Sequence, residues 1–205
     1  MIVTIDGPAA SGKGTLARRL GEALGIPVLD TGLLYRSVAD RMLRTGQPLD
    51  DPRAALEAAR TVSLSALDRD SLSRAGLGEA ASRVAAMPEV RAALLKLQQD
   101  FARSPGGAVL DGRDTGTVIA PEADVKIFVV ASPEVRAVRR FRELAGRGEA
   151  VAYEQVLADI RRRDERDAER AAAPLKPAPD AVLLDTTELD IEAAFREVLK
   201  IVRRA

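Results

Sequence analysis

The chain has 205 residues, 46% of them hydrophobic, and its 31 basic and 31 acidic side chains give a formal net charge of zero. This length suits one packed core with a modest insertion, and no apolar run approaches the roughly 20 residues that a membrane helix needs. The chain lacks His, Cys, Trp and Asn, which excludes histidine acid–base catalysis, Ser-His-Asp triads, disulfides and His- or Cys-ligated metal sites.

The charged and aromatic residues narrow the class of partner. Zero net charge and 3% aromatic residues argue against a nucleic-acid-binding surface. Arginine outnumbers lysine by 26 to 5, which suits bidentate phosphate recognition but is equally typical of a GC-rich genome. We expect a cytoplasmic monomer without a signal peptide that binds small molecules and contacts neither nucleic acid nor a membrane.

A phosphate-binding loop follows the first predicted strand. Glycines are needed in it because the backbone must bend sharply and approach phosphate oxygens. Lys13 can reach the β/γ bridge of a nucleoside triphosphate, and the positive end of the next helix faces the anion. Gly14 follows the lysine, so the hydroxyl of the motif is on Thr15. The predicted ATP-binding residues are Gly7, Pro8, Ala9, Ala10, Ser11, Gly12, Lys13, Gly14 and Thr15.

Short apolar runs alternate with helical stretches along the chain. The predicted strands are Ile2–Asp6, Val28–Asp30, Ala108–Asp111, Val125–Val130 and Ala181–Asp185. This alternation predicts a parallel sheet covered by helices on both faces. Most of the runs end in Asp, so carboxylates should gather at the carboxyl edge of the sheet, where open α/β folds bind ligands.

The helices are indicated by apolar spacing and by capping residues. The first helix has Leu16, Leu20, Ala23 and Leu24 at helical spacing, with Gly25 closing it, and the last has Ile191, Ala194, Phe195, Val198, Leu199 and Val202. The predicted N-caps are Asp51 and Ser132, each followed by Pro, and Asp190. A helical region over 79–104 is interrupted near Pro88, and the weak pattern over 61–78 predicts an insertion.

Two polar loops follow predicted strands. In the loop over 30–36, Arg36 lies one turn beyond the strand and can point back at an anion. In the loop over 111–117, Asp111 ends its strand, as the acidic residue does that holds Mg²⁺ through water beside a phosphate loop. Arg113 and Asp114 project from a turn flanked by glycines, which favours a site over a structural loop. Thr15 and Asp111 are our candidate Mg²⁺ ligands.

A run of charge occupies residues 161–170. Arg163, Arg166, Asp167 and Arg170 fall at i, i+3, i+4 and i+7 and share one helix face. Three guanidinium groups and one carboxylate on a single stripe predict a clamp for a polyanion. The apolar stripe of Val156, Leu157 and Ile160 stops just before this run, and Pro174 follows it, so we expect a weakly anchored lid.

These parts fit phosphoryl transfer, in which charge neutralisation and alignment matter more than covalent help. An acceptor that is itself a phosphate has an anionic oxygen at neutral pH and needs no strong general base. A kinase without histidine is therefore physically reasonable, and a lid would exclude water that otherwise hydrolyses the triphosphate.

Six motifs together resemble those of bacterial cytidylate kinases, in the nucleoside monophosphate kinase group. They span residues 7–15, 29–36, 111–117, 163–170, 173–175 and 184–187. The resemblance implies a P-loop α/β fold with a five-stranded parallel sheet flanked by helices, a helical lid and a monophosphate-binding insertion. It also implies transfer of the γ-phosphoryl group of ATP to CMP or dCMP with Mg²⁺, giving ADP and CDP or dCDP.

The resemblance assigns roles to individual residues. Arg36, Arg113 and Arg170 would hold the acceptor phosphate, and Asp114 would read the cytosine edge. Thr31, Arg163 and Asp167 would meet the sugar, and Arg166 would join the charges around the transferred group. The candidate catalytic residues are Lys13, Arg113, Arg163, Arg166 and Arg170.

This chain departs from the family pattern in its insertion. Family members usually have a small β-hairpin there, followed by an Ile-Arg pair whose arginine helps to read cytosine. Here the segment over 61–78 is short, and Arg74 is the candidate for that role after a one-residue shift. We expect a single domain, 1–205, with a core over 1–36, 79–148 and 174–205, an insertion over about 37–78 and a lid over about 149–173.

Two other functions remain open at this stage. One is a P-loop kinase for another acceptor, such as UMP or a small metabolite, against which residues 111–117 argue. The other is a non-catalytic ATP-binding regulator, which would have little use for a second phosphate site lined by Arg36, Arg113 and Arg170. A GTPase switch is excluded because its guanine-reading motif needs Asn.

Overall fold

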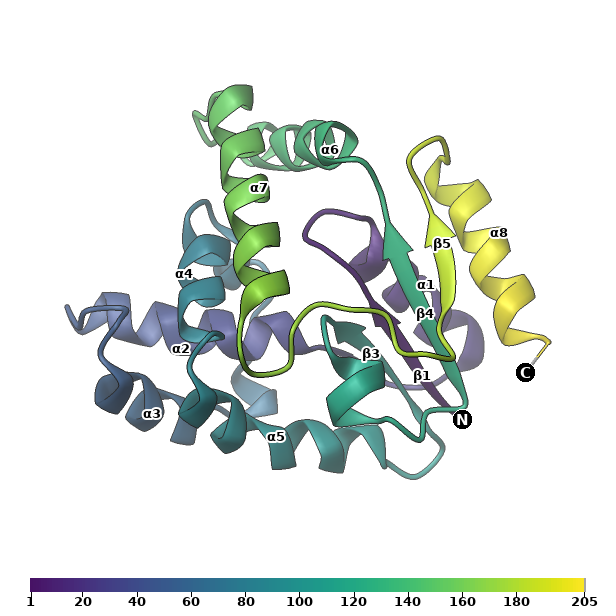
Figure 1. The fold of residues 1–205 in the computed structure, drawn as a ribbon, viewed down its shortest axis with the longest axis horizontal. Coiled ribbons are helices and arrows are strands. Elements are labelled where there is room, and N and C mark those ends of the chain that lie inside the picture. Colours follow the sequence, from purple (N-terminus) through teal and green to yellow (C-terminus); the bar gives the residue numbers. More distant parts are fainter. Residues whose placement is uncertain (205) are drawn as a thin grey trace.

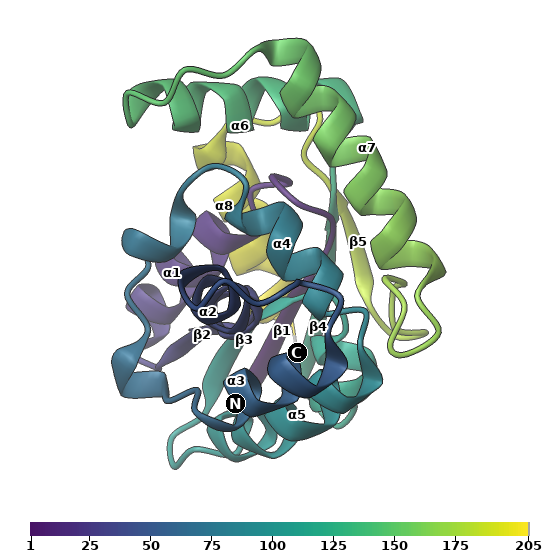
Figure 2. The ribbon, with the colours of Figure 1, turned by 90° about the vertical axis from the view of Figure 1, so that its left-hand side faces the viewer.

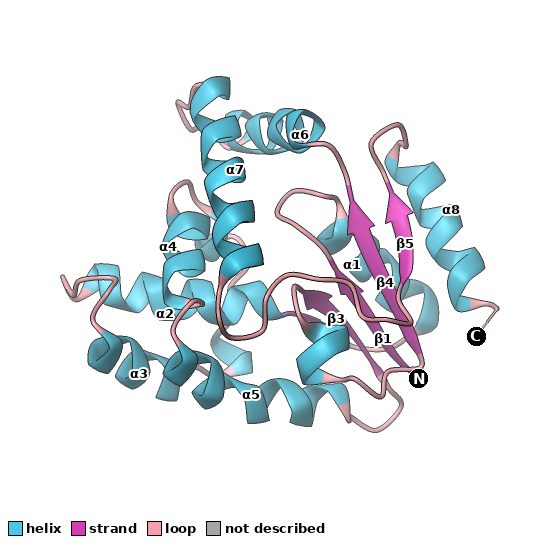
Figure 3. Cartoon of the chain, viewed as in Figure 1, coloured by secondary structure: helices cyan, strands magenta, loops and turns pink. Residues whose placement is uncertain are grey.

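Five parallel strands form the centre of the computed structural model, which describes residues 1–204 (Figures 1 and 3). Their order across the sheet is β2-β3-β1-β4-β5. The strands are β1 (Ile2–Asp6), β2 (Val28–Asp30), β3 (Ala108–Gly112), β4 (Val125–Val130) and β5 (Val182–Asp185). All five predicted strands are confirmed; β3 extends one residue further than expected and β5 begins one residue later.

The register of the sheet brings carboxylates together at its carboxyl edge. Asp30 of β2 pairs in register with Asp111 of β3, so the two carboxylates end neighbouring strands. Asp6, at the end of β1, is buried and accepts hydrogen bonds from Thr115 N at 2.9 Å, Thr115 Oγ1 at 2.8 Å and Gly116 N at 2.8 Å. The central strand therefore fixes the loop that follows β3.

Helices cover both faces of the sheet. Helices α1 (Lys13–Leu24) and α8 (Ile191–Val202) pack on one face, and α5 (Pro88–Ala102) packs on the other. The predicted apolar stripe of α1 is only partly correct. Leu16 and Leu20 are buried together with Ala17, whereas Ala23 and Leu24 are exposed, because burial against the sheet ends one turn before the helix does.

The segment that we expected to be an insertion is helical throughout its ordered elements. Helices α2 (Thr31–Arg44), α3 (Pro52–Arg60) and α4 (Leu77–Val84) share one apolar core with α5. Two short 3₁₀ turns, Leu64–Ala66 and Ser71–Ser73, connect α3 to α4. The Asp51 side chain caps α3 by accepting from the N–H groups of residues 53 and 54, as its position before Pro52 predicted.

A helix pair stands beyond the carboxyl ends of β4 and β5 (Figures 1 and 2). Helices α6 (Pro133–Gly146) and α7 (Tyr153–Glu169) pack through Ala137, Leu144, Val156 and Ile160. These residues form a small apolar cluster separate from the one beneath the sheet. No helix within residues 1–204 combines the length and apolar character that a membrane span requires.

Replacing Gly21 by alanine should destabilise the protein, although the same replacement usually stabilises a helix interior. Alanine normally stabilises a helix interior by about 1 kcal/mol relative to glycine. A Cβ at position 21, however, would lie 2.1 Å from Val28 Cγ2 and 3.0 Å from Ile26 O, and overpacking costs typically about 1–3 kcal/mol. We therefore expect Gly21→Ala to lower the free energy of unfolding measured by urea denaturation.

The matched control for this prediction is Gly146→Ala, at the end of α6. A Cβ there meets nothing within 4 Å, so this substitution should be neutral or slightly stabilising. Stabilisation by both substitutions would show that α1 can shift away from β2 at little cost.

Candidate active site

Residues 7–15 form a tight loop between β1 and α1. A Cβ at position 7 would lie 2.0 Å from the Val129 carbonyl oxygen, and Gly12 has φ 94°, so both positions require glycine. Lys13 is folded back over this loop, where its Nζ donates to Pro8 O at 3.2 Å and lies 3.8 Å from Asp111 Oδ1. The predicted phosphate loop therefore has the geometry that an anion site needs.

Gly14 explains why the motif departs from its strict pattern. A Cβ on this residue would lie 2.9 Å from Asp111 Oδ2. The missing side chain therefore lets the carboxylate at the end of β3 approach the first turn of α1. The hydroxyl of the motif is on Thr15, one residue later in the same turn of α1.

Lys13 and Asp111 are both buried, and the charge of each offsets only part of the cost of burying the other. Burial, reinforced by the nearby Arg113 guanidinium, lowers the pKa of Lys13 to about 8. Burial also raises the pKa of Asp111 to about 6, against the opposing effect of Lys13. The site therefore holds charges that a bound polyanion and its counterion would stabilise.

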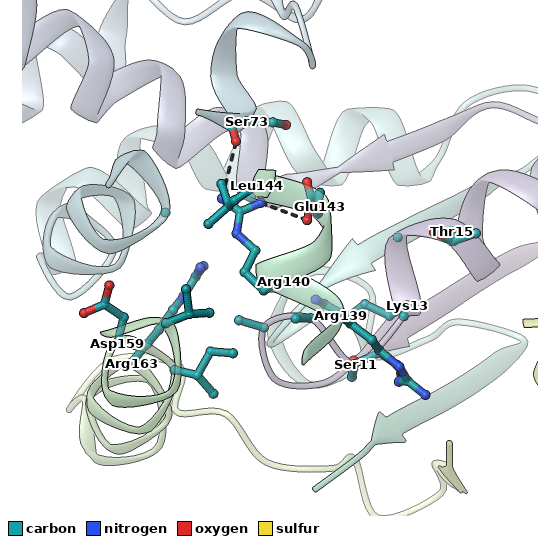
Figure 4. Close-up of a pocket in the computed structure, with 18 of the residues that line it drawn as sticks. Ser11, Lys13, Thr15, Ser73, Arg139, Arg140, Glu143, Leu144, Asp159 and Arg163 are labelled. Atoms are coloured by element: carbon teal, nitrogen blue, oxygen red, sulfur yellow. Dashed lines mark hydrogen bonds and ion pairs between the residues drawn. The ribbon is translucent and has the colours of Figure 1, made fainter. Parts of the chain in front are cut away.

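A cavity of about 1110 Å³ extends from the phosphate loop to the lid helices. Figure 4 shows Lys13 and Ser11 on one side of it and Arg163 and Asp159 of α7 on the other. Between them lies Arg139 of α6, which donates to Thr186 O at 2.6 Å and to Ser11 O at 3.3 Å. Sequence reasoning missed Arg139, because it lies on an ordinary amphipathic helix outside every recognised motif.

Three arginines meet where this cavity approaches α2, α4 and α7. Arg36 is largely buried with no carboxylate within 4 Å among the described residues, and its Nε has no hydrogen-bond partner. Arg163 also has an unpartnered buried Nε, 3.7 Å from Asp167. Burial, with neighbouring guanidinium groups, lowers the pKa of Arg36 and that of Arg163, the latter to about 9. These two groups and Arg113 form a cationic cluster that the single carboxylate of Asp167 compensates only in part.

Asp167 connects α7 to the strand loop and to α4. It accepts from Ser82 Oγ at 2.9 Å and from Arg113 Nε at 3.1 Å. Burial alone would raise its pKa, but Arg163 and Arg113 bring the pKa below its ordinary value. The carboxylate therefore lies between the cations Arg113 and Arg163; the clamp for a polyanion that the charge pattern over 161–170 predicted remains a prediction.

Asp114 is the second buried carboxylate of the site. It pairs with Arg91 of α5, and its Oδ1 lies 3.2 Å from Arg170 Nη2. The Arg91 guanidinium also lies over the Tyr35 ring, with Cζ 5.4 Å from the ring centroid. These side chains line a smaller cavity of about 30 Å³ that Thr31, Ser82, Arg113, Arg163 and Asp167 also border.

Comparison with known proteins then decides the family. The family model described as "Cytidylate kinase" matches residues 3–204. A cytidylate kinase of Xanthobacter autotrophicus is 66% identical over 207 residues, covering 100% of this chain and 99% of its own, and one of Methylocella silvestris is 62% identical, covering 100% and 95%. The chain belongs to the cytidylate kinase family.

A solved structure supports the fold of this cytidylate kinase family member. A gluconokinase from Sinorhizobium meliloti superposes with a TM-score of 0.51 at 18% identity, covering 99% of this chain and 91% of its own. The likeness concerns the fold alone. The family model and the two relatives confirm the family inferred from the motifs, and the parallel sheet together with this likeness confirms the fold class.

Two residues assigned to the site from the sequence lie away from its cavities. Arg74 pairs with Asp40 of α2, donates to Ser71 O at 3.4 Å and borders neither cavity. Arg166 turns toward α4, where its Nη2 donates to Glu79 Oε1 at 2.6 Å. Asp40 of the expected insertion and Glu79 of α4 are therefore the carboxylates with which these two arginines pair.

Two residues that the motifs did not include border the smaller cavity. Arg91 and Ser82 border the smaller cavity and bind Asp114 and Asp167. A signal for Arg91 was present, because it lies three residues before Leu94 and seven before Gln98, on the buried face of α5. A charged residue on an apolar helix face is a candidate for a paired, functional role.

The lid is also better anchored than expected. Beyond the apolar residues Val156 and Ile160, the end of α7 is held by polar contacts of Asp167, Arg166 and Arg170 to the strand loop and to α4. In addition, Arg136 of α6 binds Asp164 of α7 through two hydrogen bonds of 3.0 and 2.6 Å. Charged groups fix this part of the helix where apolar ones are missing.

The uncompensated charge of Arg36 should be a liability in the free protein. A lowered pKa means that folding disfavours the charged form, so removing the charge relieves that cost. We expect Arg36→Met to leave the unfolding temperature unchanged or higher, while most of the increase caused by CMP is lost. Thermal unfolding with and without CMP checks this.

Arg41→Met is the matched control, since Arg41 lies on the exposed face of the same helix. It should keep the full CMP effect. An Arg36→Met protein that retains the CMP effect would contradict a role of Arg36 in acceptor binding.

Proposed function

We propose that this cytidylate kinase family member transfers the γ-phosphoryl group of ATP to CMP or dCMP by in-line displacement beneath the arginine-bearing helix α7. One observation carries the proposal. Arg113 borders both cavities and acts electrostatically on Lys13 of the phosphate loop and on Arg163 of the lid. A donor site and an acceptor site therefore share one cationic wall.

The donor side is the phosphate loop. Residues 7–15 would surround the β- and γ-phosphates with backbone N–H groups, and Lys13 would bind their bridging region. Arg139 offers a planar guanidinium on the floor of the larger cavity, held by Thr186 and Ser11. Such a group can stack on the base of the donor nucleotide.

The first turn of α1 fits a magnesium ion bound together with ATP. Mg²⁺ in such sites takes one or two protein oxygen ligands and keeps several waters. The Thr15 hydroxyl and the Asp111 carboxylate are hard oxygen donors, and Gly14 leaves space for the carboxylate beside that turn. We propose these two residues as the holders of Mg²⁺, which when bound would neutralise charge on the β- and γ-phosphates.

On the acceptor side, Asp167 is shared by Arg113 and Arg163, so these two groups and Arg36 keep the excess positive charge that a monophosphate requires. Arg170 borders the smaller cavity together with Arg113 and Arg163, and it remains our prediction for a further contact from α7. Thr31 and Asp167 would meet the sugar; Thr31 is already tied to the strand loop, because its hydroxyl donates to Asp111 O at 2.9 Å.

Cytosine recognition is assigned to Asp114 and Arg91. The exocyclic amine of cytosine donates a hydrogen bond, whereas uracil presents an acceptor at the same position. A buried carboxylate such as Asp114 accepts from the amine but is repelled by the uracil oxygen, and Arg91 can donate to the neighbouring ring acceptors. This arrangement favours CMP over UMP.

The chemistry needs alignment and charge rather than a base. The acceptor phosphate oxygen, anionic at neutral pH, attacks the γ-phosphorus, and the ADP oxygen leaves with the bonding electrons. Lys13, Arg113 and Arg163 would stabilise the charge that spreads over the transferring group. We also propose that the protein is a monomer that acts in the cytoplasm.

The direct test is ADP formation from ATP and Mg²⁺ with CMP, dCMP, UMP, AMP, GMP or no acceptor. We expect strong turnover with CMP and dCMP and little with the others. Comparable turnover with UMP would contradict the role given to Asp114. If none of the nucleotides supported ADP formation, the assignment of CMP or dCMP as the acceptor would be wrong.

Substituting Arg91 and substituting Arg74 should have different effects on activity with CMP. Arg91→Ala should lower kcat/KM for CMP by about 100-fold, because it removes one charge-assisted contact and leaves Asp114 less compensated. Arg74→Ala should change it by less than about twofold. Steady-state kinetics with CMP and UMP check both.

Since loss of Arg91 leaves a buried carboxylate with a single partner, Arg91→Lys and melting curves serve as controls for folding. If Arg74→Ala lowered kcat/KM for CMP strongly and Arg91→Ala lowered it only slightly, cytosine recognition would belong to Arg74 of the insertion and not to Arg91.

A further inference from the structure

Arg69 reaches the larger cavity from the short connection between α3 and α4. Its Nη2 donates to Asp30 Oδ2 at 3.0 Å, at the carboxyl end of β2. The side chain is 36% exposed and borders the cavity. Within residues 1–204, no hydrogen bond is made by its Nε or Nη1. Two donors of this guanidinium are therefore available to a ligand.

The distance from Gly14 shows where this guanidinium lies relative to the phosphate loop. The point where a Cβ of Gly14 would lie is 2.9 Å from Asp111 Oδ2 and 4.0 Å from Arg69 Nη1. Arg69 thus overhangs the first turn of α1, beside the residue that follows Lys13. This is where the terminal phosphates of a bound triphosphate meet the helix N-terminus.

The turn that carries Arg69 is built to hold it. The Asp68 carboxylate accepts from the N–H groups of residues 70 and 71 at 3.1 and 3.3 Å. Ser73 Oγ donates to the Arg69 carbonyl oxygen at 2.7 Å and lies 3.4 Å from Arg36 Nη1, which can donate to it. The turn therefore joins Arg69 to an arginine of the acceptor site.

Arg69 also supplies a positive charge to the second of two neighbouring carboxylates at this edge of the sheet. Asp30 and Asp111 are in register on neighbouring strands, and Lys13 lies nearest to Asp111. Arg69 pairs with Asp30, whose other oxygen, Oδ1, accepts from Gly32 N at the start of α2. Asp30 can thus hold the guanidinium at the mouth of the phosphate loop while its free donors face the cavity.

We propose that Arg69 is a further catalytic residue, whose guanidinium binds the phosphoryl group in transit from the donor to the acceptor. The inference rests on the proposed function. As the acceptor oxygen forms its bond to the γ-phosphorus, the bond to the ADP oxygen breaks and that oxygen keeps the electron pair. Arg69 moves no proton; it neutralises charge on the equatorial oxygens of the transferring group.

The alternative is that Arg69 only tethers the connection to the core. Partly exposed ion pairs contribute little to stability, so loss of Arg69 should leave the fold intact under either role. The two roles differ in what else changes. A tether would alter acceptor affinity, whereas a catalytic contact would alter kcat and the binding of a transition-state mimic.

The test compares Arg69→Ala and Arg69→Lys with Arg60→Ala, an exposed arginine of α3 on the same segment. We expect Arg69→Ala to lower kcat by about 100-fold or more, the loss typical of removing one donor to a developing charge. The KM values for ATP and CMP should stay within about threefold. Arg69→Lys should recover part of the rate, and Arg60→Ala should match the wild type.

Calorimetry supplies the second readout. The wild type should bind ADP, CMP and aluminium fluoride with Mg²⁺ as one tight complex, while Arg69→Ala binds ADP and CMP but loses the fluoride-dependent gain in affinity. A kcat within twofold of the wild type, or a raised KM for CMP with a normal fluoride complex, would overturn the proposal. A wild type that forms no ADP with CMP would instead overturn the proposed function itself.

Discussion

Positive charge that is buried without an equal share of carboxylates is the constraint on which the rest of this structure depends. Arg36 and Arg163 each keep a buried Nε without a hydrogen-bond partner among residues 1–204, and the carboxylate that pairs with Lys13 there, Asp111, lies 3.8 Å away. Burying such groups opposes folding unless another part of the chain holds them in place. The sheet edge, the phosphate loop and the lid all contribute to holding them, and the bound phosphates would complete their pairing.

The scaffold achieves this through contacts that leave no room for side chains. Asp6 fixes the loop after β3 with three hydrogen bonds, while the absence of a Cβ at Gly7 and Gly14 lets Val129 and Asp111 approach the phosphate loop. The carboxylates Asp114 and Asp167 then orient the arginines without neutralising all of them. Rigid elements thus hold charges at positions that the free protein does not itself favour, which is the meaning of a preorganised electrostatic site.

The sequence predicted the parts of this molecule that local chemistry determines. The five strands, the caps at Asp51, Ser132 and Asp190 and the phosphate loop follow from neighbouring residues, and the structure confirms them. The partners of the arginines could not be predicted in this way. Whether Arg74 meets a cavity or Asp40, and whether Arg166 meets a phosphate or Glu79, depends on how helices pack across gaps of tens of residues.

The same reason explains the residues that the motifs left out. Arg91 lies on a helix whose pattern reads as ordinary core, and Ser82 on a helix that begins where the sequence signal is weak. Each borders the smaller cavity because α4 and α5 pack beside the loop after β3, so that Asp167 accepts from Ser82 and Asp114 pairs with Arg91. Packing, rather than local sequence, brings them to the site.

The helical connection between α3 and α4 gives this site its particular character. The smaller cavity is bordered by residues of α2, α4, α5 and α7 and of the loop after β3, and by no described residue of the connection between α3 and α4. Its Arg74 instead pairs with Asp40, and its Arg69 extends the opposite way, to Asp30 at the edge of the phosphate loop. Two arginines of one short connection thus have separate carboxylate partners, and because only Arg69 borders the larger cavity, the connection adds a cation there without reaching the smaller one.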